Sequence, residues 1–161
     1  MNHLPPIQNK IVRNVEALGT TLALWKFKNE KIVFTNGCFD ILHRGHVDYL
    51  IQAASLGTKL VIGLNTDASV RRLKGETRPV NEEEARALLL ASMSFTDKII
   101  FFEEDTPLEL IRFIQPDVLV KGNDYKPEEI VGYDIVKNKG GEIVTIQLTP
   151  GFSTTSILNR I

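Results

Sequence analysis

The sequence predicts an α/β fold in which helices cover both faces of a five-stranded parallel sheet. Short apolar runs rich in β-branched residues alternate with longer amphipathic stretches along the chain. The apolar runs lack the polar alternation of a half-exposed strand, as expected when both faces of a sheet are covered. Strands and helices in alternation favour parallel strands joined by right-handed crossovers.

The chain is expected to form one domain, residues 1–161, that begins with an N-terminal helical segment, residues 1–30. A chain of this length can bury about 70% of the surface that its unfolded form exposes, so no second domain is needed. The apolar positions with helical spacing in the first segment are Ile11, Val12, Val15 and Leu18.

The remaining elements follow in order. The predicted strands are residues 31–35, 59–64, 98–102, 117–121 and 142–147. The predicted helices are residues 46–56, 66–73, 82–93, 107–114 and 130–138, and a short helix follows Ser153. Pro107 suits the first turn of its helix, with Asp105 or Thr106 as the cap before it. Ligands of such sheets bind at the carboxyl ends of the strands, so the segments after the strands are the candidate site.

Composition excludes several classes of protein. With 43% apolar and 24% charged residues, the chain has ordinary globular composition, and a net charge of −1 gives no general attraction to nucleic acid or anionic lipid. One cysteine, Cys38, fits a reducing compartment. Charges interrupt the N-terminal segment, and the apolar stretches fall short of the ~20 residues of a membrane helix. We expect a cytoplasmic protein without nucleic-acid or membrane partners.

The loop after the first strand carries the densest group of candidate residues. Gly37 lets a phosphate or base approach the backbone closely. His43 and His46 are three residues apart, which predicts that their rings share one face of the first helical turn. That turn also offers unpaired N–H groups and the positive end of the helix dipole, so the pair suits a phosphate. A metal pair is the alternative, but no further ligand stands at a recognised zinc spacing, and we predict no metal site.

Two further segments follow the second predicted strand. Asp67, after Asn65, is placed either to accept from a sugar hydroxyl or to cap the next helix. A basic run then follows, with Arg71, Arg72, Lys74 and Arg78. Such a run is often a solvated face, but on the ligand side of the sheet it favours phosphate contact. Lys74 is the candidate cation for the α-phosphate.

The last two strands also end in polar residues. Gly122 permits close approach of the backbone, and its neighbours offer a cation, an amide and a carboxylate: Lys121, Asn123 and Asp124. After the final strand, three hydroxyl side chains begin a helix: Ser153, Thr154 and Thr155. Hydroxyls and amides at a helix start bind an anion or cap the helix, and both roles are compatible.

Residues 37–46, GCFDILHRGH, resemble the GxFDxxHxGH signature of the cytidylyltransferase-like nucleotidyltransferases. The resemblance extends over about residues 31–161 and implies a Rossmann-like fold of the HxGH type. Within this superfamily, residues 78–81 and 117–125 are similar to the heptose 1-phosphate adenylyltransferases. The resemblance therefore implies transfer of AMP from ATP to a heptose 1-phosphate, with release of pyrophosphate, in lipopolysaccharide precursor synthesis.

We assign the candidate residues by role. The catalytic residues are His43, His46 and Lys74. The nucleotide-binding residues are Asn36, Gly37, Cys38, Phe39, His43, His46, Arg86, Lys121, Gly122, Asn123, Asp124, Ser153, Thr154 and Thr155, of which Arg86 rests on the resemblance alone. The sugar-phosphate residues are Asp40, Asn65, Asp67 and Arg78. The expected partners are ATP, accompanied by Mg²⁺, and a sugar phosphate.

The sequence departs from its relatives at two positions. Asn123 stands where the heptose group usually has glycine, and Leu148 stands where many cytidylyltransferases have arginine. Other hypotheses remain: a cytidylyltransferase for an alcohol phosphate such as glycerol 3-phosphate, a non-catalytic nucleotide-binding module, and a relic of a class I aminoacyl-tRNA synthetase. Relatives often form dimers, so a homodimer is also open for this chain.

Overall fold

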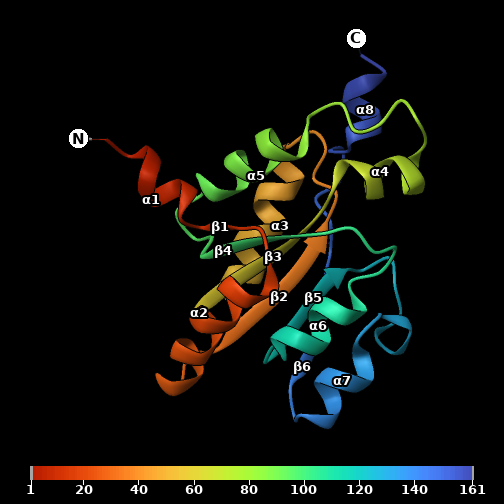
Figure 1. The fold of residues 1–161 in the computed structure, drawn as a ribbon. Helices are drawn as coiled ribbons and strands as arrows, with labels where there is room; N and C mark the ends of the chain where they lie inside the picture. The colour runs from red at the N-terminus through yellow and green to blue at the C-terminus, as the bar shows by residue number, and fades with distance from the viewer. Residues whose placement is uncertain (1, 161) are drawn as a thin grey trace.

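The structure is a computed structural model that describes residues 2–160; residues 1 and 161 of the predicted domain lie outside the described residues. Its centre is a parallel sheet of six strands in the order β1-β4-β3-β2-β5-β6 (Figure 1). The strands are β1 (Ile11–Val12), β2 (Ile32–Gly37), β3 (Lys59–Asn65), β4 (Lys98–Phe102), β5 (Val118–Gly122) and β6 (Glu142–Ile146).

Helices cover both faces of the sheet, as predicted. They are α1 (Leu4–Gln8), α2 (Val15–Phe27), α3 (Arg44–Ala54), α4 (Asp67–Lys74), α5 (Glu83–Ala91), α6 (Leu108–Ile114), α7 (Tyr133–Asn138) and α8 (Thr154–Leu158), with a 3₁₀ turn η1 (Pro127–Glu129). Successive residues of β2 point to opposite faces. Ile32 and Phe34 pack in one core cluster with α2, α6 and α7, and Val33 packs in the other with α3 and α5.

The sheet has six strands rather than the five predicted, because Ile11 and Val12 form an edge strand and not part of a helix. They pair in parallel with Ile99 and Ile100 of β4. Their β-branched side chains suit a strand, and the ladder with β4 outweighs the local helical spacing. Helix α2 begins only after Asn14, whose side chain accepts a hydrogen bond from the Ala17 N–H.

Two predicted helix starts also differ. Pro107 is the N-cap residue of α6 and not a residue of its first turn, and no side chain caps this helix. The helix predicted at 130–138 begins later: η1 ends before it at Glu129, Gly132 adopts a positive φ of 91°, and α7 begins at Tyr133. The positive φ at Gly132 explains the break, because residues with a side chain rarely adopt it.

The topology places a ligand crevice between β2 and β5. From β2 the chain proceeds to β3 and β4 on one side, and then returns to place β5 and β6 on the other. The order therefore reverses beside β2, and sheets of this kind bind ligands at the carboxyl ends next to that reversal. The two strands are linked there by a hydrogen bond from Lys121 Nζ of β5 to Asn36 Oδ1 of β2.

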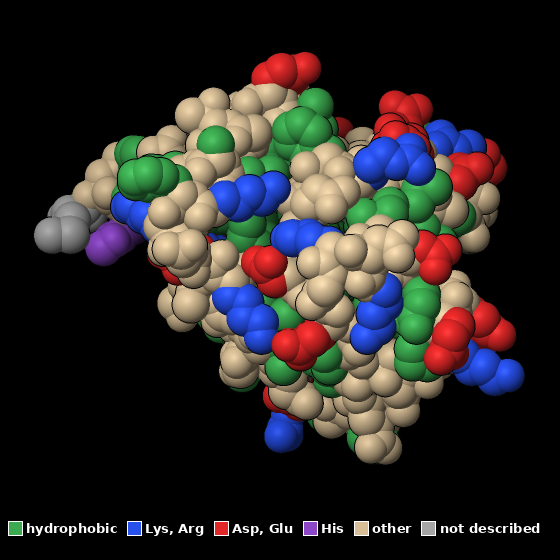
Figure 2. Space-filling view, turned by 90° about the horizontal axis from the view of Figure 1, so that it is seen from below, with side chains coloured by type: hydrophobic (Ala, Val, Ile, Leu, Met, Phe, Trp, Pro, Cys, Tyr) green, Lys and Arg blue, Asp and Glu red, His purple; other side chains and the backbone are tan. Residues whose placement is uncertain are grey.

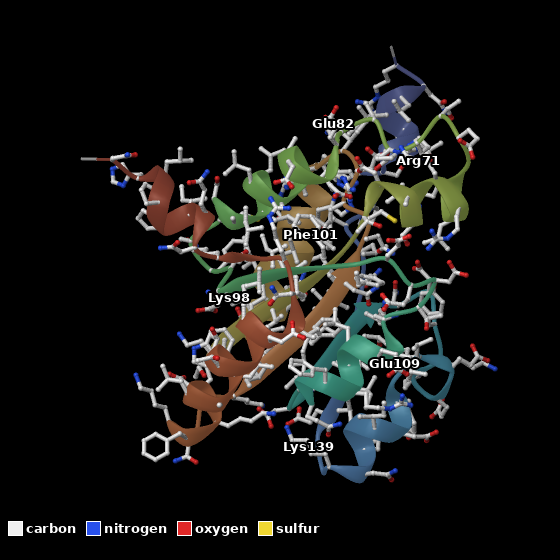
Figure 3. All side chains as sticks on the ribbon, in the orientation of Figure 1. Arg71, Glu82, Lys98, Phe101, Glu109 and Lys139 are labelled. Carbon is white, nitrogen blue, oxygen red and sulfur yellow. The ribbon has the colours of Figure 1, made fainter. Side chains whose placement is uncertain are left out.

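The surface agrees with the low net charge. Figure 2 shows a face on which Lys and Arg side chains are interspersed with Asp and Glu. Figure 3 shows Arg71 on α4, near the end of the molecule that carries α8, and Lys139 at the opposite end. Among residues 2–160, no helix has both the length and the apolar character that a bilayer span requires.

Candidate active site

A cleft of about 340 Å³ opens at the carboxyl ends of β2 and β5. Thirteen of the predicted site residues line it: Asn36, Gly37, Cys38, Phe39, Asp40, His46, Asn65, Lys74, Arg78, Lys121, Gly122, Asp124 and Thr154. The other predicted residues do not line it: His43, Asp67, Arg86, Asn123, Ser153 and Thr155. Three further wall residues were not among the predicted site residues, namely Tyr49, Tyr125 and Leu148.

The two histidines stack at the start of α3, as their spacing predicted. Their ring centroids are 3.8 Å apart, with an angle of 19° between the planes. His43 is the N-cap residue, and its Nδ1 accepts a hydrogen bond from the His46 N–H at 3.3 Å. Since Nδ1 accepts, the proton of neutral His43 lies on Nε2, which is left free to donate. The N-cap hydrogen bond of α3 therefore joins the two histidines and helps to hold their rings together.

Neighbouring residues fix the position of this pair. A Cβ atom added to Gly45 would lie 3.1 Å from the His43 ring and 3.1 Å from Cβ of Phe152, so glycine allows the close approach of the two segments. On the other side, the edge of the Phe39 ring meets His46, with centroids 5.3 Å apart. Phe39 adopts a φ of 45°, which is uncommon for a residue with a bulky side chain.

Burial lowers the pKa of two basic side chains in the cleft, His46 and Lys121. It lowers the pKa of His46 to about 4, with smaller contributions from the positive charges of His43 and Lys74. His46 is thus neutral near pH 7 in the free protein. Its Nδ1 is buried without a hydrogen-bond partner, so the Nε2 edge is the one available to the cleft. Burial also lowers the pKa of Lys121 to about 8, which leaves mainly the charged form at neutral pH.

The lowered pKa of His46 predicts that stability falls in weak acid. The ordinary value is 6.5 and the folded value is about 4, so between them the unfolded chain binds more protons than the folded one. We expect the free energy of unfolding to be lower at about pH 5 than at about pH 7.5, and His46→Gln to reduce this difference. Urea unfolding of both proteins at the two pH values measures it. An equal pH dependence in the two proteins contradicts the prediction.

Asp40 and Arg78, both predicted as sugar-phosphate ligands, bind each other. Arg78 Nε donates to Asp40 Oδ2 at 2.5 Å, and the N–H groups of Val80 and Asn81 donate to Oδ1 at 2.7 and 3.0 Å. Burial opposes ionisation of Asp40, but the bonds from Asn81, Arg78 and Val80 together hold its pKa below the ordinary value. The Asp40 carboxylate therefore anchors residues 78–81 at the cleft through these hydrogen bonds.

Arg86, predicted to bind the phosphates of the nucleotide, has internal hydrogen-bond partners in this structure. It is fully buried. Its guanidinium donates to the carbonyl oxygens of Cys38, Asn65 and Asn81 and to the Asp67 carboxylate, at 2.6 to 2.9 Å. Asp67, predicted as a sugar ligand or a helix cap, is thus an ion-pair partner of Arg86. Arg86 thus ties together three segments of the cleft wall.

The remaining predicted contacts lie at the rim. Lys74 is the last residue of α4, is exposed and reaches the cleft. Thr66 caps α4 by accepting from the Ser69 N–H, which is the role the sequence allowed for Asp67. Ser153 caps α8 by accepting from the Ser156 N–H, so its capping role is confirmed, and Thr154 faces the cleft.

Among the wall residues that the sequence analysis missed, Tyr49 has the clearest role. Its hydroxyl hydrogen-bonds to Thr35 Oγ1 at 2.7 Å, and burial raises its pKa to about 12. This bond joins α3 to β2 and so fixes the helix that carries His46. Tyr49 occupies an ordinary buried position of an amphipathic helix, and only its polar partner on β2 distinguishes it.

The comparisons with known proteins agree with this geometry. The family described as cytidylyltransferase-like matches residues 34–160. The chain is 52% identical over 153 residues to the bifunctional protein HldE of Rhodopseudomonas palustris, in a match that covers 95% of this chain and 31% of that protein. The chain spans about a third of the length of such curated relatives.

Two solved structures resemble it as well. The lipopolysaccharide core biosynthesis protein from Thermoplasma volcanium matches with a TM-score of 0.61 and 26% identity, over 74% of this chain and 97% of that one. A pantoate-beta-alanine ligase from Francisella tularensis has a TM-score of 0.65 at 17% identity, over 94% of this chain and 72% of that one. The second likeness concerns the fold alone.

Proposed function

This chain belongs to the cytidylyltransferase-like family, and from that premise we propose that it transfers AMP from ATP to D-glycero-β-D-manno-heptose 1-phosphate. The products are ADP-heptose and pyrophosphate, and the reaction serves lipopolysaccharide precursor synthesis. The observation that carries the proposal is the stacked His43–His46 pair at the N-terminus of α3, beside a cleft lined by two lysines. Helix N-termini with unpaired N–H groups suit phosphate.

The proposed reaction is a direct displacement. A phosphate oxygen of the sugar phosphate attacks the α-phosphorus of ATP, a new P–O bond forms, and the bond to the β-phosphate oxygen breaks in line with it. A phosphate dianion is already nucleophilic, so no side chain has to remove a proton from it. The protein contributes alignment and stabilisation of the growing negative charge.

Each residue of the pair has a definite part in this step. His43 donates from Nε2, since its Nδ1 is occupied by the helix cap. His46 offers its Nε2 edge from the cleft wall, and a bound phosphate raises its pKa from about 4, because nearby negative charge favours the imidazolium form. Lys74 supports the α-phosphate from the rim, and the start of α8 holds the leaving pyrophosphate.

Magnesium enters with the nucleotide. Among residues 2–160, no three His, Cys, Asp or Glu side chains are grouped so that they could hold a metal ion. Of the two carboxylates in the cleft, Asp40 is already engaged by Arg78, which leaves Asp124. Mg²⁺ ordinarily keeps several waters and binds phosphates with one or two carboxylates. We therefore treat MgATP as the substrate, with phosphate oxygens and water as the main ligands.

The choice of acceptor is supported by residues 78–81 and 117–125, which resemble the heptose group. Asn81 has a structural role in the first of these segments, because its N–H and side-chain amide both donate to Asp40. The similarity to a lipopolysaccharide core biosynthesis protein from Thermoplasma volcanium agrees with this acceptor.

A pyrophosphate-release assay tests the proposal. We expect turnover with ATP and β-heptose 1-phosphate, and at least tenfold less with the α-anomer, with CTP or with glycerol 3-phosphate, a difference of about 1.4 kcal/mol or more. Turnover with CTP and glycerol 3-phosphate supports the cytidylyltransferase alternative. Tight ATP binding without pyrophosphate release from any acceptor supports a non-catalytic module.

A further inference from the structure

A second cavity, of about 300 Å³, adjoins the cleft across the edge of the sheet. Four residues line both spaces and form the wall between them: Asn36, Asn65, Lys121 and Tyr125. The rest of the second cavity comes largely from the segments that precede α6 and α7, including Asp105, Thr106 and Glu129. The cleft instead receives residues from α3 and α8, on the opposite face of the sheet.

Lys121 is the cation in the shared wall. Its ammonium donates to Asn36 Oδ1. None of the ion pairs within residues 2–160 includes it. Burial lowers the pKa of Lys121 to about 8, which reflects the free energy cost of a charge without an anionic partner. A phosphate dianion between the two cavities supplies such a partner.

The two asparagines of the wall leave further groups for a ligand. A lysine ammonium can only donate, so the Asn36 amide presents its oxygen to Lys121 and keeps its NH₂ group for another acceptor. The Asn65 NH₂ group donates to Ser69 Oγ at 3.0 Å, which leaves Asn65 Oδ1 as an acceptor. One amide thus offers a donor for a phosphate oxygen, and the other offers an acceptor for a hydroxyl.

We propose that Lys121, which the sequence placed with the nucleotide ligands, instead binds the phosphate of the acceptor, whose sugar ring occupies the second cavity. This inference rests on the proposed function and identifies its acceptor site. Asn36 donates to the same phosphate. Asn65 Oδ1 and the carboxylate of Glu129 accept from sugar hydroxyls, which a polyhydroxylated ring supplies and glycerol 3-phosphate supplies only in part.

The arrangement of the two cavities fits an in-line reaction. The nucleotide lies on the α3 and α8 side of the sheet, with its α-phosphate at the histidine pair. The acceptor enters from the α6 and α7 side, and its phosphate meets the nucleotide at the shared wall. The attacking oxygen and the departing pyrophosphate are then on opposite sides of the α-phosphorus, as the displacement requires.

Calorimetric titration of the full chain tests Lys121. We expect Lys121→Met to weaken binding of β-heptose 1-phosphate by about 10- to 100-fold, the range for loss of a charged hydrogen bond. Binding of α,β-methylene-ATP should change by less than about twofold, because the lysine does not contact it. Lys74→Met, on the nucleotide side, is the matched control and should show the reverse. Weaker binding of the ATP analogue with unchanged binding of the sugar phosphate overturns the proposal.

A second measurement does not depend on turnover or on the identity of the sugar. Lysines methylated with ¹³C are followed by NMR, and Lys121 is assigned by the signal that Lys121→Met loses. Its titration near pH 8 should move upward when inorganic phosphate or the sugar phosphate is added, because an adjacent anion favours the ammonium form. An unchanged titration with both ligands overturns the proposal. A shift without any pyrophosphate release instead retains the anion site and rejects the proposed function.

Discussion

Replacing His46 with alanine is expected to lower kcat by about 10²–10³, the usual cost of losing one well-placed donor to a developing negative charge. His46 is the member of the stacked pair that lines the cleft. Its Nδ1 is buried without a hydrogen-bond partner among the described residues. Its removal therefore deletes a contact to the reacting phosphate, together with the ring contacts to His43 and Phe39.

Two measurements separate this effect from misfolding. Pyrophosphate release gives kcat, and urea unfolding gives the free energy of unfolding, which we expect to change by less than about 1.5 kcal/mol. His43→Ala is the comparison, since it also removes the N-cap of α3 and should cost about 1 kcal/mol of stability in addition. A folded His46→Ala protein with unchanged kcat rejects the catalytic role of His46.

The sequence was sufficient for features that depend on residues close together in the chain. The spacing of His43 and His46 predicted a shared face, and the structure stacks the rings there. Ser153 was a predicted cap, and it caps α8. Helix caps such as these follow local rules, because their hydrogen bonds join residues two to four positions apart. Such features need no knowledge of the partners that the rest of the fold provides.

Features that depend on distant partners were missed or misread. The β1 strand has only two residues and exists through its ladder with β4, so local spacing favoured a helix instead. Asp40 and Arg78 were both assigned to the sugar phosphate. Their charges are opposite, and the fold brings them together in an ion pair although they lie 38 positions apart in the sequence. The sequence marked both residues for the cleft, and the structure was needed to pair them.

Arg86 is the clearest case, and it gives the second prediction. Arg86→Met is expected to lower the free energy of unfolding by about 3–5 kcal/mol, as found when one partner of a buried charged network is removed. The guanidinium bonds three carbonyl oxygens and the Asp67 carboxylate, and the side chain is fully buried. Methionine fills much of the volume but leaves these acceptors without donors, so the cost is electrostatic rather than one of packing.

Arg72→Met is the matched control, because Arg72 also pairs with carboxylates but is exposed. Its ion pairs with Glu103 and Asp105 are accessible to solvent, and their loss should cost less than about 1 kcal/mol. Arg86→Lys should recover little of the stability, since a single ammonium cannot reach acceptors in three segments at once. Urea unfolding measures all three variants. If Arg86→Met folds with nearly wild-type stability but binds α,β-methylene-ATP much more weakly, Arg86 leaves its buried network to contact the phosphates, as the family resemblance implied. If stability falls as expected, the arginine acts on the reaction only through the cleft wall that it holds together.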